Sequence, residues 1–139
     1  MNVFIDTNVL MDVLLERQPF VKDSRKVWFL AERGKLRGLV SVLSFPNIYY
    51  IVGRVRGAEA AMAMMTMLRD TFTPVALDEQ ILNQAMDASL PDFEDAIQYY
   101  SALRADAGCL LTRNADDFPQ SDALPVLSPA EFLAAHTFK

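Results

Sequence analysis

The feature that most constrains the fold is a regular alternation of short apolar runs with longer segments of helical character. The first run, Val3-Phe4-Ile5, is followed at once by Asp6 and then by a helical segment that begins with Thr7. Further short apolar runs lie at 38–42, 74–77, 109–112 and 126–127. Strands that alternate with helices favour a mostly parallel sheet covered on both faces. With 139 residues, 52% of them apolar, the chain has enough material for a single domain over 1–139.

Helices are expected between these runs, at 7–16, 21–33, 44–52, 59–72, 78–88 and 92–105, with a last one after Ser128. The first helix should stop near Gln18-Pro19, because proline disfavours helix in the residue before it. Gly34 is expected to take the left-handed conformation after the second helix. Ser44 is expected to cap the third helix, which should end before Gly53. The segment 128–131 predicts a capping box with proline in the first turn.

Composition excludes several classes of protein. Cys109 and His136 are the only cysteine and the only histidine, so an intrachain disulfide is impossible and a structural zinc site is excluded. No apolar run approaches the roughly 20 residues that a membrane span requires. The N-terminus lacks a basic and then apolar leader. These features predict a cytoplasmic protein without membrane contact.

The net charge of −5 is unevenly distributed along the chain. Up to Arg56 there are nine Lys and Arg against five Asp and Glu, whereas the remainder has four against thirteen. A basic N-terminal portion could meet phosphates while the acidic portion supplies a metal pocket. An ordinary surface with chance clustering of charge explains the same numbers equally well.

Acidic side chains stand at three predicted strand ends or helix starts. Asp6 follows the first strand, Asp92 and Asp95 open the helix at 92–105, and Asp117 follows the strand at 109–112. We expect the first and fourth strands to be adjacent, and ligands in such folds bind at the carboxyl ends of the strands. One convergent acidic pocket is therefore expected there. Ligands that are all oxygens select Mg²⁺ or Mn²⁺.

Each of these acids has a purely structural alternative. Asp6 could simply cap the helix that follows it, and Asp92 with Asp95 could form an acidic variant of the capping box. Asp95, however, lies at the edge of an apolar stripe, where an unpaired carboxylate is costly. Glu94 points elsewhere on the helix and is expected to face solvent. The polar loop after Thr112 could be an Asx turn and nothing more.

Three segments in order and at matching spacing resemble the PIN-domain family, metal-dependent nucleases related to VapC-type toxins of toxin–antitoxin pairs. They are Phe-Ile-Asp-Thr-Asn-Val-Leu at 4–10, Phe-Glu-Asp-Ala at 93–96 and Thr-Arg-Asn-x-x-Asp-Phe at 112–118. The resemblance covers essentially the whole chain. It implies a three-layer α/β/α sandwich with a mostly parallel central sheet. It also implies a divalent-metal-dependent endoribonuclease with an RNA substrate and an antitoxin partner.

The resemblance also implies the residues of the site. An acidic quartet would comprise Asp6, a residue on the helix after the second strand, Asp95, and Asp117 or Asn114. The family usually has a glutamate on that helix, and here Asn47 takes its place. Asparagine can ligate through its carbonyl oxygen but brings no charge, so metal binding is expected to be weaker.

Taken together, the expected catalytic residues are Asp6, Asp95, Asp117 and Asn47. Mg²⁺ or Mn²⁺ is expected to be held by Asp6, Asp95, Asp117, Asn114 and Asp92. Contacts with the substrate are expected from Arg54, Arg113, Thr7 and Asn8. Arg54 is included because it shares a helix face with Asn47 and Tyr50, although a solvated stripe explains that spacing as well.

Two other readings of the sequence stay open. A PIN-like domain that lost its fourth carboxylate at Asn47 could bind RNA or protein without catalysis. A phosphoacceptor domain of flavodoxin-like topology also gathers aspartates at strand ends, but no lysine follows a late strand here. Met62 and Met67 fall outside the apolar stripe of their helix, which suits a homodimer contact or an antitoxin contact, with peripheral packing as the alternative.

Overall fold

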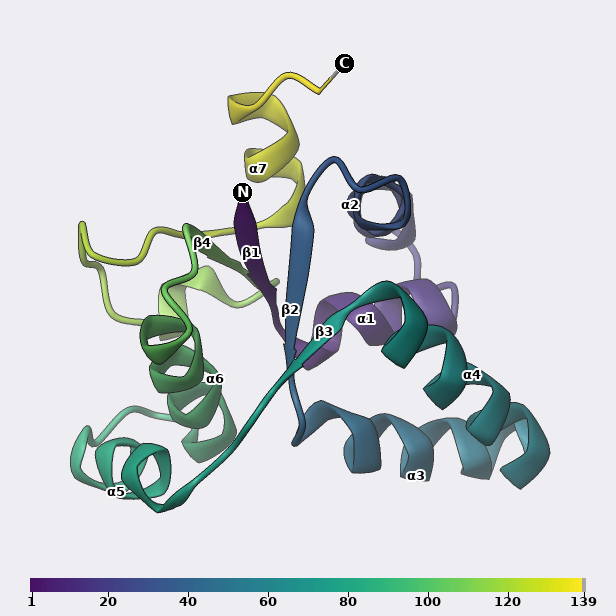
Figure 1. The fold of residues 1–139 in the computed structure, drawn as a ribbon, viewed down its shortest axis with the longest axis horizontal. Helices are drawn as coiled ribbons and strands as arrows, with labels where there is room; N and C mark the ends of the chain where they lie inside the picture. Colours follow the sequence, from purple (N-terminus) through teal and green to yellow (C-terminus); the bar gives the residue numbers. More distant parts are fainter. Residues whose placement is uncertain (139) are drawn as a thin grey trace.

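The computed structural model describes residues 1–138 and shows a three-layer α/β/α sandwich (Figure 1). Within this range one parallel sheet has the strand order β3-β2-β1-β4-β5. Its strands are β1 (Asn2–Ile5), β2 (Arg37–Ser41), β3 (Thr73–Val75), β4 (Cys109–Leu111) and β5 (Val126–Leu127). The expected fold class is confirmed, and so is the adjacency of the first and fourth strands.

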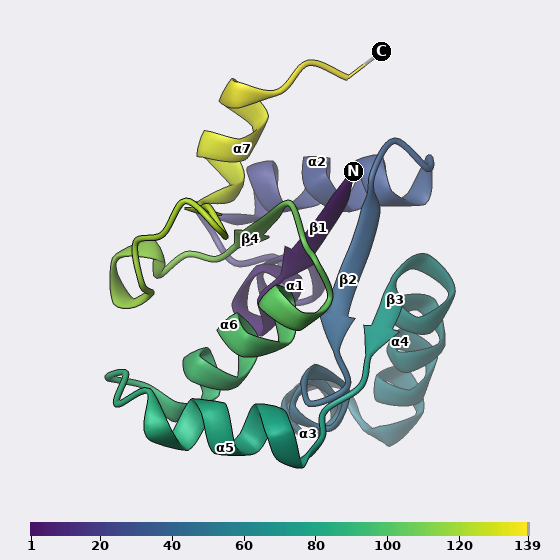
Figure 2. The ribbon, with the colours of Figure 1, turned by 60° about the vertical axis from the view of Figure 1, so that its left-hand side comes forward.

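Helices cover both faces of the sheet and form its connections (Figures 1 and 2). They are α1 (Thr7–Leu14), α2 (Val21–Glu32), α3 (Ser44–Arg56), α4 (Ala58–Thr71), α5 (Glu79–Asp87), α6 (Phe93–Arg104) and α7 (Pro129–Ala135), with a short 3₁₀ turn at Ala115–Asp117. Over residues 1–138, no helix combines the length and the apolar character that a membrane crossing requires.

Successive side chains of the strands enter two different cores. Phe4 of β1 and Leu110 of β4 pack with Tyr99 and Ala102 of α6 on one face. Their neighbours on the same strands pack on the other face against α1, α2, α3, α4 and α7. Because adjacent residues of a strand point to opposite faces, near-continuous apolar strands are what a sheet covered on both sides requires. The two cores fix the register of the strands and therefore the positions of the residues that follow them.

The pairing of β1 with β4 brings two polar residues together at the carboxyl edge. Ile5 is paired with Leu111, so Asp6 and Thr112 are the first residues beyond the paired strands. The Asp6 backbone N–H donates to the Leu111 carbonyl oxygen at 2.9 Å, which continues the ladder by one step. The topology thus places the start of α1 beside the loop after β4.

The third helix differs from its prediction at both ends. Ser44 is the first residue of α3 and makes no capping bond, because its hydroxyl bonds to Thr7 instead. The helix also continues through Gly53 to Arg56. A Cβ atom at Gly53 would lie 3.9 Å from the Ala61 Cβ of α4, so the glycine sits at the contact between α3 and α4. Tertiary packing here overrides the weak helix propensity of glycine.

The predicted helix ends are confirmed elsewhere. Gly34 has a φ of 69° directly after α2, in the left-handed region that favours glycine. The Ser128 hydroxyl accepts from the Glu131 backbone N–H at 3.1 Å, and the Glu131 carboxylate accepts from the Ser128 backbone N–H at 2.9 Å. This reciprocal pair is the capping box predicted for α7.

Candidate functional site

Asp6 is a buried carboxylate held at the end of β1. It occupies the cap position of α1, yet its side chain makes no capping bond. Its Oδ2 instead accepts from the Thr112 hydroxyl at 2.7 Å, and the residue is only 3% exposed. Burial raises the pKa of Asp6 to about 6, although the hydrogen bond from Thr112 opposes that rise. The purely structural alternative of a helix cap therefore fails for this residue.

Asp95 faces Asp6 from the first turn of α6. Asp92 caps this helix, since its Oδ1 accepts from the Asp95 backbone N–H at 3.0 Å. The carboxylate of Asp95 remains free of that bond and is partly buried. Burial, together with the nearby negative charges of Asp6, Asp92, Asp117 and Glu94, raises the pKa of Asp95 to about 7. Electrostatic coupling of this kind requires the carboxylates to lie near one another.

Four of these acids line one hollow of about 250 Å³, which we call the acidic hollow. Asp6 forms its floor at the sheet edge, and Asp92, Glu94 and Asp95 approach from α6. Ile51 of α3 and Arg17, which follows α1, also line it. Figure 2 shows that α1, α3 and α6 meet at this end of the sheet. Of Asp6, Asp95 and Asp117, which were predicted to converge, the first two share this hollow together with Asp92, and Asp117 does not line it.

Asp117 and Asn114 lie in a neighbouring hollow of about 380 Å³, lined also by Arg113, Ser128 and Glu131, which we call the loop hollow. Asp117 is close enough to Asp95 for its charge to raise the pKa of Asp95. In the part of the chain that the structure describes, no group of three or more Asp, Glu, His or Cys side chains is placed to hold a metal ion together. The acidic site is therefore open, and any shell around a cation would need water or substrate oxygens as well.

Asn47 is joined to an acid that the sequence reading had placed in solvent. Its Nδ2 donates to the Glu94 Oε1 at 3.2 Å, across from α3 to α6. Glu94 is exposed but lines the acidic hollow, and its charge raises the pKa of both Asp6 and Asp95. Glu94 faces solvent, as expected, but the sequence did not indicate that it also lines the acidic hollow. The acid missing from α3 at Asn47 has a counterpart directly opposite, on α6.

Thr112 and Asn8 brace the loop after β4. The Thr112 hydroxyl, besides binding Asp6, accepts from the Asn114 backbone N–H at 3.1 Å and from the Asn8 Nδ2 at 3.4 Å. The Asn8 Oδ1 accepts from the Arg113 backbone N–H at 3.4 Å. Both ends of the Asn8 amide are therefore used inside the protein. The contact predicted between Asn8 and substrate stays a prediction, and the structure gives this side chain a bracing role.

Thr7 belongs to an uncharged buried cluster behind the site. Its hydroxyl lies 2.6 Å from the Ser44 hydroxyl and accepts from the Gln98 Nε2 at 3.0 Å. All three side chains are buried, and they join α1, α3 and α6. Because this hydroxyl is already engaged, the predicted contact of Thr7 with substrate also stays a prediction. The cluster holds together the three helices that carry the acids.

A second buried aspartate, Asp12, stands on α1 two turns beyond Asp6. Its side chain is fully buried, and its Oδ2 lies 2.8 Å from the Arg113 Nε. Its Oδ1 lies 4.0 Å from the Arg17 Nη1. Burial raises the pKa of Asp12, whereas the charges of Arg113 and Arg17 lower it. Asp12 thus neutralises Arg113 and holds it against the core.

The structure also changes which arginine faces the acids. Arg54 lies 5.6 Å from the Tyr50 ring centre and 3.5 Å from the Tyr50 hydroxyl, and it is not among the residues that line the acidic hollow. Arg17 does line it. The sequence reading missed Arg17 because it follows the first helix in a loop whose path cannot be read from helical spacing. Its place two residues before Pro19 was the only available sign of that turn.

Comparison with known proteins places this architecture in a family. The family model described as the PIN domain matches residues 2–116. The chain therefore belongs to the PIN-domain family, as its three motifs predicted. A comparison with curated proteins finds no match to the chain.

Solved structures of VapC-type proteins share the fold. VapBC-1 from nontypeable Haemophilus influenzae aligns with a TM-score of 0.68 and 17% identity, over 94% of this chain and 99% of that chain. A toxin–antitoxin complex from Klebsiella pneumoniae gives 0.68 and 17%, over 91% and 97%. Mycobacterium tuberculosis VapC20, described as a sarcin-ricin loop cleaving toxin, gives 0.62 and 15%, over 78% and 86%. At these identities the likeness shows the fold.

Proposed function

We propose that the protein is a divalent-metal-dependent endoribonuclease and the toxin of a toxin–antitoxin pair. The observation that carries the proposal is the pair of facing carboxylates at the sheet edge, Asp6 and Asp95, whose pKa values are raised to about 6 and about 7. Such a pair is costly to ionise together without a cation. Membership of the PIN-domain family gives the reaction class, hydrolysis of a phosphodiester.

The residues present fit Mg²⁺ or Mn²⁺. The donors in the acidic hollow are carboxylate oxygens, which these ions prefer. Asp6 and Asp95 would hold the ion, with Asp92, Asp117, Asn114 and the Glu94–Asn47 pair close by. Because no three acids of residues 1–138 are placed to hold an ion together, water or substrate oxygens would complete its shell. When bound, such an ion lowers the pKa of a water molecule and stabilises negative charge on phosphate oxygens.

The other side chains prepare the site for this chemistry. Thr112 fixes the orientation of the Asp6 carboxylate through its 2.7 Å hydrogen bond. Arg17 lines the same hollow with a side chain that is 39% exposed, and only a 4.0 Å contact joins it to Asp12. A loosely paired guanidinium beside an acidic cluster can bind a phosphate oxygen of the substrate. We therefore assign phosphate binding to Arg17 in addition to the contact predicted for Arg54.

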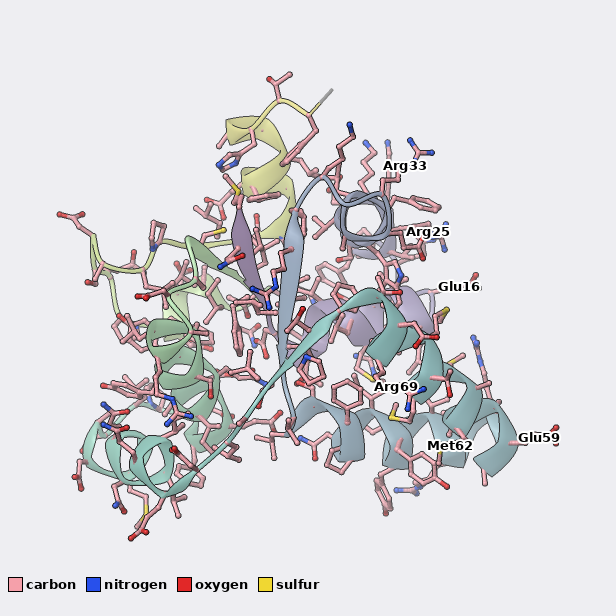
Figure 3. All side chains as sticks on the ribbon, viewed as in Figure 1. Glu16, Arg25, Arg33, Glu59, Met62 and Arg69 are labelled. Carbon is pink, nitrogen blue, oxygen red and sulfur yellow. The ribbon has the colours of Figure 1, made fainter. Side chains whose placement is uncertain are left out.

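An apolar groove supports a protein partner. It has a volume of about 300 Å³ and lies between α1, α2 and α4, where Trp28, Phe29, Met64 and Met67 line it. Glu16 and Arg25, an ion pair at 3.7 Å, also line this groove. Met62 and Arg69, labelled on α4 in Figure 3, are not among its lining residues. Flexible exposed methionines suit protein contacts. Two of the similar structures were solved as toxin–antitoxin complexes, and we propose an antitoxin here. A homodimer through Met62 stays a prediction.

The test is cleavage of single-stranded and structured RNA by the purified full-length chain. We expect cleavage with Mn²⁺ or Mg²⁺ and none with EDTA. Asp95→Asn should abolish it, whereas Asp122→Asn, an exposed loop acid outside both hollows, should cleave as the wild type does. A folded wild-type chain that binds RNA but does not cleave it at millimolar Mn²⁺ would favour the non-catalytic alternative. We propose that the reaction takes place in the cytoplasm, the location predicted from the sequence.

A further inference from the structure

A third cavity lies beyond the loop hollow, on the far side of Arg113. It has a volume of about 260 Å³, and we call it the base cavity. Pro19, Phe20, Asp23, Ser24, Arg113 and Pro129 are among the residues that line it. It shares Arg113 and Ser128 with the loop hollow, which in turn contains Asp117. A ligand that extends from the acidic site through the loop hollow therefore reaches this cavity.

One wall of the cavity is formed by flat groups on which a planar ligand can stack. The Arg113 guanidinium lies 4.2 Å from the centre of the Phe20 ring, and Phe20 is 39% exposed at the start of α2. Pro19 and Pro129 add further rigid apolar surface. Aromatic rings and guanidinium planes are the surfaces on which unpaired bases of single-stranded RNA stack.

The charges of the cavity argue against a phosphate. Arg113 carries the only positive charge among the lining residues, and Asp12 already neutralises it from behind at 2.8 Å. Asp23 adds a negative charge at the cavity itself. A phosphate group would meet repulsion from Asp23 without a free cation to offset it. An uncharged flat group with polar edges fits this environment better.

One polar group is available to the edge of such a ligand. The Asp23 carboxylate can accept hydrogen bonds only, so it prefers a base whose edge presents N–H donors. Ser24 also lines the cavity, but its hydroxyl is buried and does not reach the ligand. Guanine presents two N–H donors side by side on its Watson–Crick edge, which matches the two oxygens of a carboxylate. The volume is just below the range of about 300–1,000 Å³ for drug-sized ligands, which suits a single base.

We propose that this cavity binds one base of the RNA strand, guanine in preference to the others, at a nucleotide that flanks the cleaved bond. The proposal rests on the proposed ribonuclease function. It gives Arg113 a defined part in substrate binding, as a stacking surface for a base and not as a phosphate ligand. Phe20 and Asp23 become the residues that set the base preference.

The experiment is fluorescence anisotropy with the wild-type chain in EDTA, so that binding is measured without cleavage. The probes are six-residue oligouridines in which one guanine replaces each uridine in turn, and matched oligonucleotides with an abasic site at the same place. We expect one position at which guanine binds at least about fivefold more tightly than the abasic site, within the range of one base–aromatic stack. Equal binding at every position would overturn the proposal.

Variants then locate the effect. Phe20→Leu keeps apolar contact with Arg113 but removes the ring, and it should abolish the preference for guanine over the abasic site. Asp23→Asn should reduce discrimination between guanine and uridine and leave binding of the abasic probe unchanged. Leu82→Ala is the control, because Leu82 on α5 has the same 39% exposure as Phe20 and lies outside the cavity. If both cavity variants keep the full guanine preference, the cavity is not the binding site.

The two proposals fail separately in these assays. Guanine-dependent binding in EDTA, without cleavage when Mn²⁺ is added, would overturn the nuclease and leave the base cavity in place. Cleavage by the wild type together with base-independent binding would overturn the base cavity alone. Mn²⁺ affinity, measured for Phe20→Leu, should equal that of the wild type; a parallel loss of both affinities would mean that Phe20 merely supports the loop.

Discussion

Two aspartates on the same segment of chain, Asp6 and Asp12, are buried to almost the same extent, 3% and 0% exposed. Burial raises the pKa of both. Their partners differ. Asp12 faces two arginines, at 2.8 Å and 4.0 Å, whereas Asp6 receives one hydroxyl hydrogen bond and faces further carboxylates across a hollow.

This difference separates a structural acid from a functional one. An ionised group in a protein interior is retained when a counter-ion or hydrogen bonds offset the loss of hydration. Asp12 has its counter-ions within the fold. Among the described residues, none forms an ion pair with Asp6, and Arg17, which lines the hollow, pairs with Asp12. A cation that enters the hollow would therefore balance the charge of Asp6. A buried carboxylate without a counter-ion, and not a buried carboxylate as such, therefore distinguishes the candidate site.

The largest effect should come from Asp6→Asn. The amide keeps the size of the side chain and can still accept from Thr112, but it cannot hold a cation in the same way. We expect RNA cleavage to fall by about 100-fold or more, because the stabilisation of the transition state by the ion is lost. Cleavage within threefold of the wild type would show that Asp6 is not a ligand.

The same substitution should stabilise the metal-free fold. At pH 7.5 the folded chain carries the cost of an ionised Asp6 whose pKa is raised from 3.8 to about 6. Asp6→Asn removes this cost, which we place at about 2 kcal/mol in the free energy of unfolding. Urea denaturation in EDTA measures it. A less stable variant would contradict the comparison with Asp12.

The pH dependence of stability should also show that ionisation of Asp6 destabilises the metal-free fold. Below pH 3.8 Asp6 and Asp95 are protonated in both states and contribute no penalty. Between pH 3.8 and about 6 for Asp6, and between pH 3.8 and about 7 for Asp95, the unfolded chain releases these protons while the folded chain retains them. The metal-free protein should therefore lose stability over this window and change little above it. Thermal melts in EDTA from pH 4.5 to 8 should show this decline. Mn²⁺ should reverse it at the upper end, and Asp6→Asn should flatten it.

Asp12→Asn should act in the opposite direction from Asp6→Asn. It removes the counter-ion of Arg113, whose side chain is 27% exposed and can only partly recover hydration. Breaking a buried pair costs about 3–5 kcal/mol, and partial exposure of the arginine reduces our expectation to about 2 kcal/mol of lost stability. Urea denaturation alongside Asp6→Asn provides the direct contrast. Equal stabilisation by both variants would remove the distinction between the two aspartates.

The smallest effect concerns the contact between Asn47 and Glu94. Glu94→Gln should weaken Mn²⁺ binding by about tenfold, the lower end of what groups around a metal shell contribute. The double variant Asn47→Glu with Glu94→Gln exchanges acid and amide across the same 3.2 Å contact and should recover most of the loss. Titration of Mn²⁺ by calorimetry measures both. Wild-type affinity in Glu94→Gln would show that this carboxylate does not support the ion.

Sequence patterns predicted much of this molecule because the relevant information is local. The apolar runs predicted the strands, and Asp6 and Asp95 were found because each stands where an element begins or ends. Gly34 and the Ser128 capping box involve residues three or four positions apart. Such local contacts can be predicted from the sequence alone.

The misses all involve contacts between distant segments. The contact of Glu94 with Asn47 was missed because helical spacing describes only the helix that carries Glu94. Gly53 was taken as a helix end because the nearby Ala61 Cβ comes from another helix. Arg17 reaches the acidic hollow through a loop. The pairing of Asp12 with Arg113 spans about a hundred positions of sequence, which no periodicity reveals.

The uncharged cluster of Thr7, Ser44 and Gln98 has a consequence for how this chain can change over time. It joins three helices by hydrogen bonds that involve none of the acids in the hollow. The side chains that hold the helices together are therefore different from the acids of the hollow. An acid can be replaced while the fold is kept. A copy with Asp6→Asn, one nucleotide away in the genetic code, would keep the apolar groove and the base cavity. If the proposed nuclease is correct, an inactive competitor of it is thus a single mutational step away.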